Sequence, residues 1–376
     1  MNGALSQVWG MINGLQLPVH YPALDVEFPE STEDGVEILL GVVTFDIPYV
    51  NLVDGLGSGI TLPQNHDFTH GDSELAENLD SLDFSSRLAS ANLGSVFIAL
   101  LVSPIIYGLT FLLGLIKKTT NNPSVHELHA WLEAKFMWNW LIRLTLETSL
   151  ELTMSAVMAL CVSFKERESS WIETADFIFS CFIIFWIFSY IVFVVYFYPQ
   201  NSDILKYQVF KDVYGSTYEG LRPKVTSLGY PIIFIVRRAL FVAAALLWSR
   251  FLWLQIMSQV VMTTLAAVYV VHFKPMEDVR AYRLEIFNEQ TAMLALSLTF
   301  CFSDLVPDNN KYYVGVLFNC LLLGNILIHM SFIIKGIIQD ARESFERKKI
   351  KTQSQEANSE HVRKFKDLRK KRRNEI

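Results

Sequence analysis

Basic residues are missing from the first 86 positions, which contain no lysine or arginine. Fourteen carboxylates fall between Asp25 and Asp83, whereas the stretch from His361 to Ile376 has eight Lys/Arg residues against two acidic ones. Charge is also scarce overall, because only 19% of the residues are charged, 51% are hydrophobic, and the mean hydropathy is +0.29. A soluble protein of this length would need more charge. The composition therefore predicts a multi-pass membrane protein.

Several signatures of chemistry are missing as well. The four cysteines lie within hydrophobic blocks and form no CxxC pair, which argues against a disulfide framework and against a cysteine metal site. Residues 1–20 lack the basic start and the clean apolar core expected of a signal peptide. We also find no glycine-rich phosphate loop, serine nucleophile motif or complete calcium loop in the sequence. The sequence therefore predicts no enzymatic activity, no cofactor and no metal site.

Seven hydrophobic segments are long enough to cross a bilayer about 30 Å thick. They cover residues 93–116, 136–164, 176–198, 231–248, 251–273, 288–305 and 312–334. We therefore expect an all-α polytopic membrane protein in three parts: an acidic N-terminal segment, a seven-helix transmembrane domain and a basic cytoplasmic tail, at 1–92, 93–338 and 339–376. Residues 4–20 are apolar but short, which is typical of an interfacial, re-entrant or partial transmembrane piece. The acidic stretch 30–86 is expected to be a flexible, solvated loop.

The loops between the predicted spans indicate the orientation of the chain. Loops with several Lys/Arg residues alternate with acidic or very short loops, so all the basic loops and the basic tail fall on one side. The positive-inside rule assigns that side to the cytoplasm. We expect a plasma-membrane protein with its amino end outside and its carboxyl end in the cytosol.

Ionisable residues in the second predicted span offer the clearest clue to function. Arg143, Glu147 and Glu151 recur every four residues, and on a continuous helix they would lie within an arc of about 80°. Each costs about 2.5–3.5 kcal/mol in lipid, so this face must meet protein or water. Arg237 and Arg238, on the fourth predicted span, are expected at a similar depth. The five residues form either a packing cluster of ion pairs or the lining of an ion or proton path, unless the two arginines reach the inner interface.

Further polar residues follow a helical spacing in two other predicted spans. Gln255, Gln259 and Thr263 recur every four residues, and such side chains act as interhelical hydrogen bonders worth about 0.6 kcal/mol each, or as a pore lining. Asn325 and His329 share a face of the last span. The histidine is interpreted as a hydrogen-bonded packing residue, with a proton relay as the alternative.

The carboxyl-terminal tail is strongly basic. Beside an anionic inner leaflet, each basic residue contributes about 1 kcal/mol to binding. The alternative is a solvated tail that only sets the topology. Seven spans argue against nucleic acid as a partner. The residues predicted to contact lipid are Arg363, Lys364, Lys366, Arg369, Lys370, Lys371, Arg372 and Arg373.

Several phrases, in order, resemble a known multi-pass module. This module forms the C-terminal part of large cysteine-rich surface proteins of ciliates and is grouped with TRP-like membrane proteins. The phrases are WGMINGLQ at 9–16, HYP at 20–22, FDIP at 45–48, IRLTLE at 142–147, YGSTYEG at 214–220, RR at 237–238 and EIFNE at 285–289. The resemblance implies an all-helical membrane domain, with cation conduction by analogy to TRP and polycystin channels. Family members have a further hydrophobic segment and an ectodomain before the first phrase, so the resemblance also implies a shortened relative or a C-terminal fragment.

The leading functional hypothesis is a TRP-like cation channel or transport module. In this hypothesis Glu147 and Glu151 attract cations, and Arg143 and Arg237 hold them or gate the path. Several subunits would be needed, since no selectivity-filter loop is evident in one chain. One alternative is a seven-span surface receptor or adhesion protein that signals through residues 206–224 and the tail. Another is a non-conducting membrane scaffold.

Overall fold

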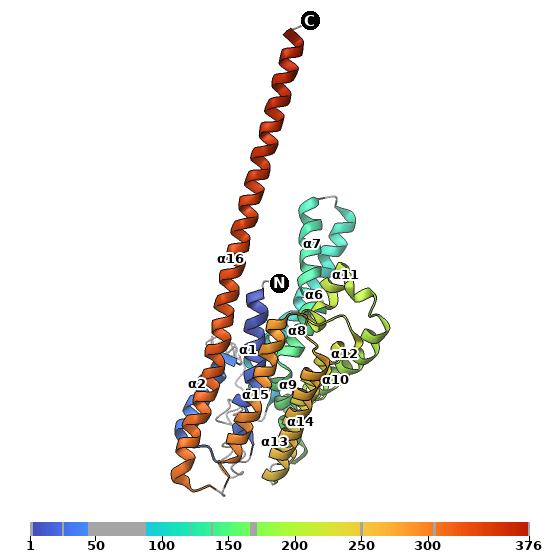
Figure 1. The fold of residues 1–376 in the computed structure, drawn as a ribbon. Helices are drawn as coiled ribbons and strands as arrows, with labels where there is room; N and C mark the ends of the chain where they lie inside the picture. Colours follow the sequence, from blue (N-terminus) through green and yellow to red (C-terminus); the bar gives the residue numbers. More distant parts are fainter. Residues whose placement is uncertain are drawn as a thin grey trace. The chain divides into compact units, whose positions relative to one another are not determined.

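The computed structural model describes residues 3–24, 26–43, 88–120, 122–136, 138–165, 171–248, 251–303 and 306–374. These residues form helices joined by short turns, with no strand among them beyond an isolated bridge between Leu221 and Met276. The predicted all-α class is therefore confirmed for the described residues (Figure 1). The chain divides into two compact units, Met1–Met11 with Ile326–Ile376, and Ile12–Asn325.

Most of the helices belong to the larger unit. The long ones are α6 (Gly94–Thr119), α7 (Pro123–Phe136), α8 (Trp138–Glu147), α9 (Ser149–Lys165), α10 (Trp171–Gln200), α11 (Gln208–Tyr218), α13 (Tyr230–Leu247), α14 (Leu252–Phe273) and α15 (Val279–Phe300). Short ones are η1 (Tyr21–Ala23), α5 (Ala89–Asn92), η3 (Ile204–Lys206) and α12 (Val225–Leu228), with α2 (Glu30–Val43) near the start. Two helices cross the division between the units, α1 (Gly3–Val19) and α16 (Asp308–Asn374).

Five described helices are long and apolar enough to cross a membrane. Their spans are Val96–Thr119, Trp171–Gln200, Val225–Leu247, Leu252–Phe273 and Asn309–Gln339. A sixth is added if the bent pair Asn139–Glu147 and Ser149–Cys161 forms one span. These helices are those expected of a multi-pass integral membrane protein.

The prediction of seven spans is not confirmed. The predicted span 288–305 falls on α15, which is not among the helices that pass the test of length and apolarity. The reason lies in its first half, which contains Arg280, Arg283, Glu285 and Glu289. These charges lower the hydropathy of α15 and give the helix another role, described below.

The prediction of one continuous helix over 136–164 is wrong. The chain breaks at Thr148, and the two halves are bent by 67°. Hydroxyl groups crowd the break, since Thr148 Oγ1 donates to the Leu144 carbonyl at 2.7 Å and Ser149 Oγ to the Leu146 carbonyl at 3.0 Å. Hydrogen bonds from hydroxyl side chains to carbonyls of the preceding turn bend helices. A side chain that bonds a backbone carbonyl of the helix, as Gln16 does at Glu147, has the same effect. Arg143 and Glu147 therefore lie on α8, and Glu151 lies on α9 past the bend.

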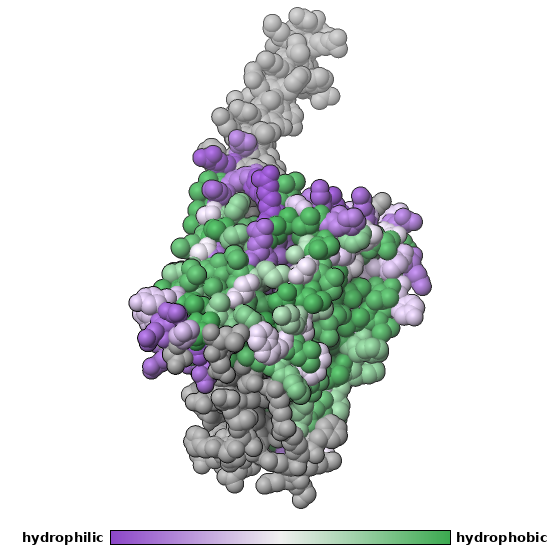
Figure 2. All heavy atoms as spheres, turned by 60° about the horizontal axis from the view of Figure 1, so that its bottom comes forward, coloured by the Kyte–Doolittle hydropathy of each residue, from purple (hydrophilic) through white to green (hydrophobic). Residues whose placement is uncertain are grey.

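The larger unit buries an apolar core and exposes apolar helix faces. One buried cluster joins residues of α8, α9, α10 and α13, among them Ile142, Leu152, Ile187 and Ile235. The outward faces of α6, α10 and α14 also present large hydrophobic side chains. Figure 2 shows hydrophobic side chains over much of one face of the molecule. Examples are Phe111, Phe182, Phe185, Phe188 and Val261, each more than half exposed. Apolar faces of this extent mark a surface made for lipid or for a partner.

The acidic N-terminal segment contains more structure than a solvated loop. Residues 30–43 form α2, and residues 12–19 of α1 are largely buried, so the prediction of a flexible loop is wrong for 30–43. Its remainder, 44–86, lies outside the described residues. Close packing holds both helices: a Cβ at Gly14 of α1 would overlap the Asn288 side chain, and one at Gly35 of α2 would overlap Asn319.

Candidate functional site

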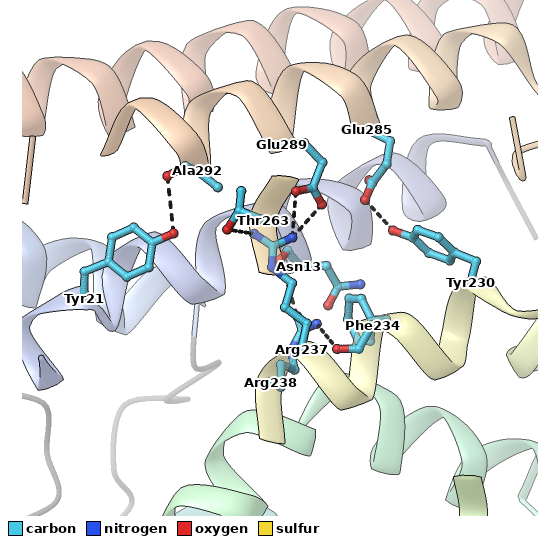
Figure 3. A network of polar contacts seen from close by, with 10 residues as sticks. All are labelled: Asn13, Tyr21, Tyr230, Phe234, Arg237, Arg238, Thr263, Glu285, Glu289 and Ala292. Atoms are coloured by element: carbon cyan, nitrogen blue, oxygen red, sulfur yellow. Dashed lines mark hydrogen bonds and ion pairs between the residues drawn. The ribbon is translucent and has the colours of Figure 1, made fainter. Parts of the chain in front are cut away.

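A buried ion pair joins α13 to α15. Arg237 Nη1 donates to both carboxylate oxygens of Glu289, at 2.6 and 2.7 Å, and Nη2 donates to Thr263 Oγ1 of α14 at 3.3 Å (Figure 3). Arg237 is 8% exposed and Glu289 is 7% exposed. Charges this deep are costly unless they are paired or hydrogen-bonded, because removing either one from water costs several kcal/mol. The pair therefore ties three helices together.

Arg238 turns to a different neighbour. Adjacent residues on a helix point about 100° apart, so Arg238 faces α1 while Arg237 faces α15. It is 2% exposed, and its Nε and Nη2 donate to Gln16 Oε1 at 3.1 and 2.5 Å. Its remaining bonds reach the carbonyls of Asn13 and Phe234, and its guanidinium carbon lies 3.3 Å from the Phe234 ring centroid. Every hydrogen-bond acceptor around Arg238 in the described chain is a neutral group.

Gln16 connects this arginine to the broken helix. While its oxygen accepts from Arg238, its Nε2 donates to the Glu147 carbonyl at 2.8 Å. That carbonyl is the last of α8, at the break before α9. One side chain of α1 therefore links the buried arginine of α13 to the bend, and this inserted amide helps to explain why the helix breaks there.

A second carboxylate of α15 meets the start of α13. The Tyr230 hydroxyl donates a short hydrogen bond to Glu285 Oε1 (Figure 3). Glu285 and Glu289 share one face of α15, since they are four residues apart. The contacts Tyr230–Glu285 and Arg237–Glu289 occur in the same order along both helices, so α13 and α15 run parallel. Glu285 lies outside the segments able to span a membrane, and burial, reinforced by Glu289, raises its pKa to about 7.

Long side chains from α13 and α15 leave a cavity between these helices. It has a volume of about 30 Å³ and lies between α1, α13, α14 and α15. A cavity needs about 10–15 Å³ to hold one water, so this cavity has room for about two waters or one small ion. Apolar side chains line part of its wall. Its polar lining consists of Asn13, Tyr230, Arg237, Arg238, Tyr269, Glu285, Asn288 and Glu289.

The residues predicted to form a charged face do not meet as expected. Arg143 Nε lies 3.4 Å from Glu147 Oε1, so the four-spaced pair forms, and Arg143 Nη2 is also 4.0 Å from Glu219 Oε2. Arg237, however, pairs with Glu289 and not with Glu147. Arg237 and Arg238 are buried in the helix bundle and do not reach an interface.

The predicted polar residues of α14 lie on one buried face. Gln255, Gln259 and Thr263 are each at most 2% exposed. Gln255 Nε2 donates to the Ala245 carbonyl of α13 at 3.2 Å, and Thr263 accepts from Arg237. These two contacts are interhelical hydrogen bonds, as the first of the two interpretations expects.

The polar residues predicted on the last span lie on α16. Asn325 donates to Thr291 Oγ1 at 3.0 Å and to Asn288 Oδ1 at 3.4 Å, both on α15. His329 lies four residues further along α16, in the smaller unit. The backbone of 363–373 continues the same helix, and the side chains predicted to contact lipid lie outside the described ones.

Sequence reasoning did not assign several residues of this site, among them Gln16, Tyr230, Glu285 and Glu289. A signal for the two glutamates was present, because they are four residues apart at the edge of a predicted span. Gln16 had no such signal, since it is one uncharged polar residue in a short apolar segment.

Comparison with known proteins adds no further assignment. The chain matches no protein-family model, no curated protein and no solved structure. The geometry of the cavity is therefore the main basis for a functional proposal.

Proposed function

We propose that this chain is an ion-transport module of a membrane and that the cavity between α1, α13, α14 and α15 is its ion-handling site. One observation supports this most directly. Four ionisable side chains, Arg237, Arg238, Glu285 and Glu289, line one small cavity in a unit whose outer helices present apolar side chains.

The energetic cost of this cluster supports a role beyond packing. Replacing a buried ion pair by apolar residues of similar volume is often neutral or stabilising by about 1–4 kcal/mol. A single pair would suffice to bind α13 to α15, yet the site adds Arg238 and Glu285. Arg237 and Arg238 lie in a helix able to span a membrane, and ionisable residues in such helices commonly mark ion or proton pathways.

The broken helix α8–α9 supports the same proposal. Transporters commonly form their sites beside discontinuous helices, whose exposed backbone groups contact the ion or substrate. Here the side chain of Gln16 links the C-terminal end of α8 to Arg238, because it is hydrogen-bonded to both. A change in the bend would therefore act directly on an arginine of the cavity.

The remaining features expected from the sequence belong to this proposal. They are the TRP-like plan, which rests on the ordered phrases from 9–16 to 285–289, the plasma-membrane location with a cytoplasmic tail, an assembly of several copies, and contact of the basic tail with anionic lipid. Neither Glu147 nor Glu151 lines the cavity, so the proposal assigns the ion to α13 and α15 instead.

Ion flux in proteoliposomes tests the proposal. The full chain is reconstituted, and fluxes of potassium, sodium, protons and chloride are measured with ion-selective dyes. We expect flux of at least one ion, reduced at least tenfold by Arg238→Gln and by the paired change Arg237→Gln with Glu289→Gln. The matched control is Glu147→Gln with Glu151→Gln, which leaves the cavity lining intact.

Two results would contradict the proposal. If the wild-type protein carries none of these ions, a non-conducting scaffold or a receptor becomes the better description. If only the Glu147 and Glu151 control abolishes flux, the path lies along α8 and α9, and the cavity is a packing feature. Gel filtration and melting in detergent establish that each variant is folded.

A further inference from the structure

The two adjacent arginines of α13 differ in how their charge is balanced. Arg237 has a carboxylate partner, with Nη1 2.6 Å from Glu289 Oε1. Arg238 is the more deeply buried of the two, and among the described residues no carboxylate oxygen lies within 4.0 Å of it. Its bonds end on the Gln16 amide oxygen and on two backbone carbonyls. A buried cation without a bonded counter-ion is costly, and the two carboxylates of the cavity are bonded to Tyr230 and Arg237 instead.

Arg237, which lines the cavity, also has unused hydrogen-bond capacity. Arg237 Nε is fully buried and has no acceptor in the described structure, although Nη1 and Nη2 of the same side chain are both bonded. A buried donor without an acceptor is destabilising, more so if it is charged. Both arginines line the cavity, so a negatively charged occupant would be attracted by two guanidinium groups, of which only that of Arg237 has a bonded carboxylate.

The volume and chemistry of the cavity restrict what this occupant can be. Room for about two waters excludes an organic substrate of more than a few atoms. Two guanidinium groups disfavour a cation, and a water would leave Arg238 without a bonded counter-ion, because Glu289 is bonded to Arg237 and Glu285 to Tyr230. We infer that the cavity binds one small monovalent anion of the size of chloride, with the guanidinium groups of Arg238 and Arg237 as its ligands. The inference rests on the proposed function and deepens it, since it names the class of ion.

The two carboxylates of the cavity are compatible with this anion. Glu289 is occupied by Arg237, which offsets its charge. Glu285 accepts from Tyr230 and is the group that competes with an anion for the field of Arg238. When Glu285 takes up a proton, the cavity keeps two positive charges and one negative charge. That balance favours an anion.

Chloride binding to the purified full chain in detergent tests the inference. Melting temperature is measured against chloride concentration, with sodium gluconate, too large for the cavity, keeping the ionic strength constant. A ligand that binds only the folded state raises its apparent stability. We expect a saturable rise with chloride and bromide and none with gluconate. Equal melting temperatures in all three salts would overturn the inference.

Two variants establish where the anion binds. Arg238→Gln is expected to weaken chloride binding by about tenfold or more, because a charge-assisted hydrogen bond is lost. Arg143→Gln, which removes an arginine on α8 outside the cavity, leaves binding unchanged. Equal loss in both variants would indicate a nonspecific salt effect and overturn the site.

A second substitution covers the case in which Arg238→Gln does not fold. Gln16→Glu puts a carboxylate where Arg238 now meets a neutral oxygen, so it supplies the missing counter-charge. Broadening of the chloride NMR line by the wild-type protein is then expected to disappear in the variant, and undiminished broadening would contradict the inference. Binding in detergent does not depend on transport. Chloride binding without any flux rejects only the proposed function, whereas cation flux without chloride binding rejects only the anion site.

Discussion

Arg237 Nη1 lies 2.6 Å from Glu289 Oε1, and these residues are 52 positions apart in the chain. The contact joins α13 to α15 across a gap that also holds Thr263 of α14. It is the centre of a buried network of polar side chains that extends to Gln16 on one side and to Glu285 on the other. Substitutions in this network distinguish a role in maintaining the fold from a role in binding an ion.

Removing one partner of the central pair should destabilise the protein strongly. Arg237→Gln leaves Glu289 buried without its cation, which costs about 3–5 kcal/mol. Adding Glu289→Gln removes the orphaned charge, so we expect the double variant to be more stable than Arg237→Gln alone. The free energies of unfolding in detergent, measured with denaturant, give this comparison. A double variant that is less stable than both single variants would show that the two charges do not act as a pair.

Gln16 should be important for both the arginine and the bend. Gln16→Ala removes the acceptor of Arg238 and the donor to the Glu147 carbonyl, and we expect a loss of about 2–4 kcal/mol. Gln16→Glu keeps an acceptor for the arginine and is expected to lose less. Equal stability of wild type and Gln16→Ala in detergent would mean that the amide is dispensable.

Close approach of α1 to α15 depends on Gly14. A Cβ at this position would overlap Asn288, so Gly14→Ala is expected to cost about 1–3 kcal/mol through forced displacement of the helices. Gly10→Ala on the same helix is the control, because its Cβ meets nothing within 4 Å. That control should be neutral or slightly stabilising, since alanine is the better helix former. The prediction is checked by the melting temperatures of the two variants, and equal values would contradict it.

Glu285 should make stability depend on pH in a defined direction. Its pKa in the fold is raised to about 7, from an ordinary value of 4.5, so the folded state prefers the protonated form. Its contribution is therefore fully present below pH 4.5 and is lost as the pH rises to about 7, by about 3 kcal/mol. Glu285→Gln lacks this loss. We expect the wild type to lose stability relative to this variant over that interval, and parallel curves would contradict the assignment.

Chloride binding should strengthen as the pH falls. Protonation of Glu285 removes a negative charge that competes with the anion, so affinity rises as the pH drops through about 7. The other titratable groups that line the cavity are Tyr230, Tyr269, Arg237, Arg238 and Glu289, and α1 contributes none. Chloride titrations at several pH values should show this rise in the wild type and a pH-independent affinity in Glu285→Gln. If the chloride affinity of the wild type falls on acidification, the Glu285 carboxylate does not compete with chloride.

Features that depend on local spacing could be predicted from the sequence. The length and apolarity of segments in the sequence predicted helices that match α6, α10, α13, α14 and α16. These features are visible in the sequence because every turn of such a helix needs apolar side chains, whether it faces lipid or other helices. The four-residue spacing of Arg143 and Glu147 likewise predicted their ion pair, since such neighbours meet on any helix. The burial of Gln255, Gln259 and Thr263 on one face followed from the same rule.

Which groups distant in sequence meet could not be predicted, because it depends on how the helices pack. Arg237 had several carboxylates within possible reach, and the parallel arrangement of α13 and α15 selected Glu289. The break at Thr148 escaped prediction because its cause includes an amide from α1, 131 residues away from the carbonyl that it binds. Helical periodicity records which face of a helix is polar. The partner of that face depends on the packing of helices remote in sequence, and the cavity beside Arg238 exists only because four of them converge there.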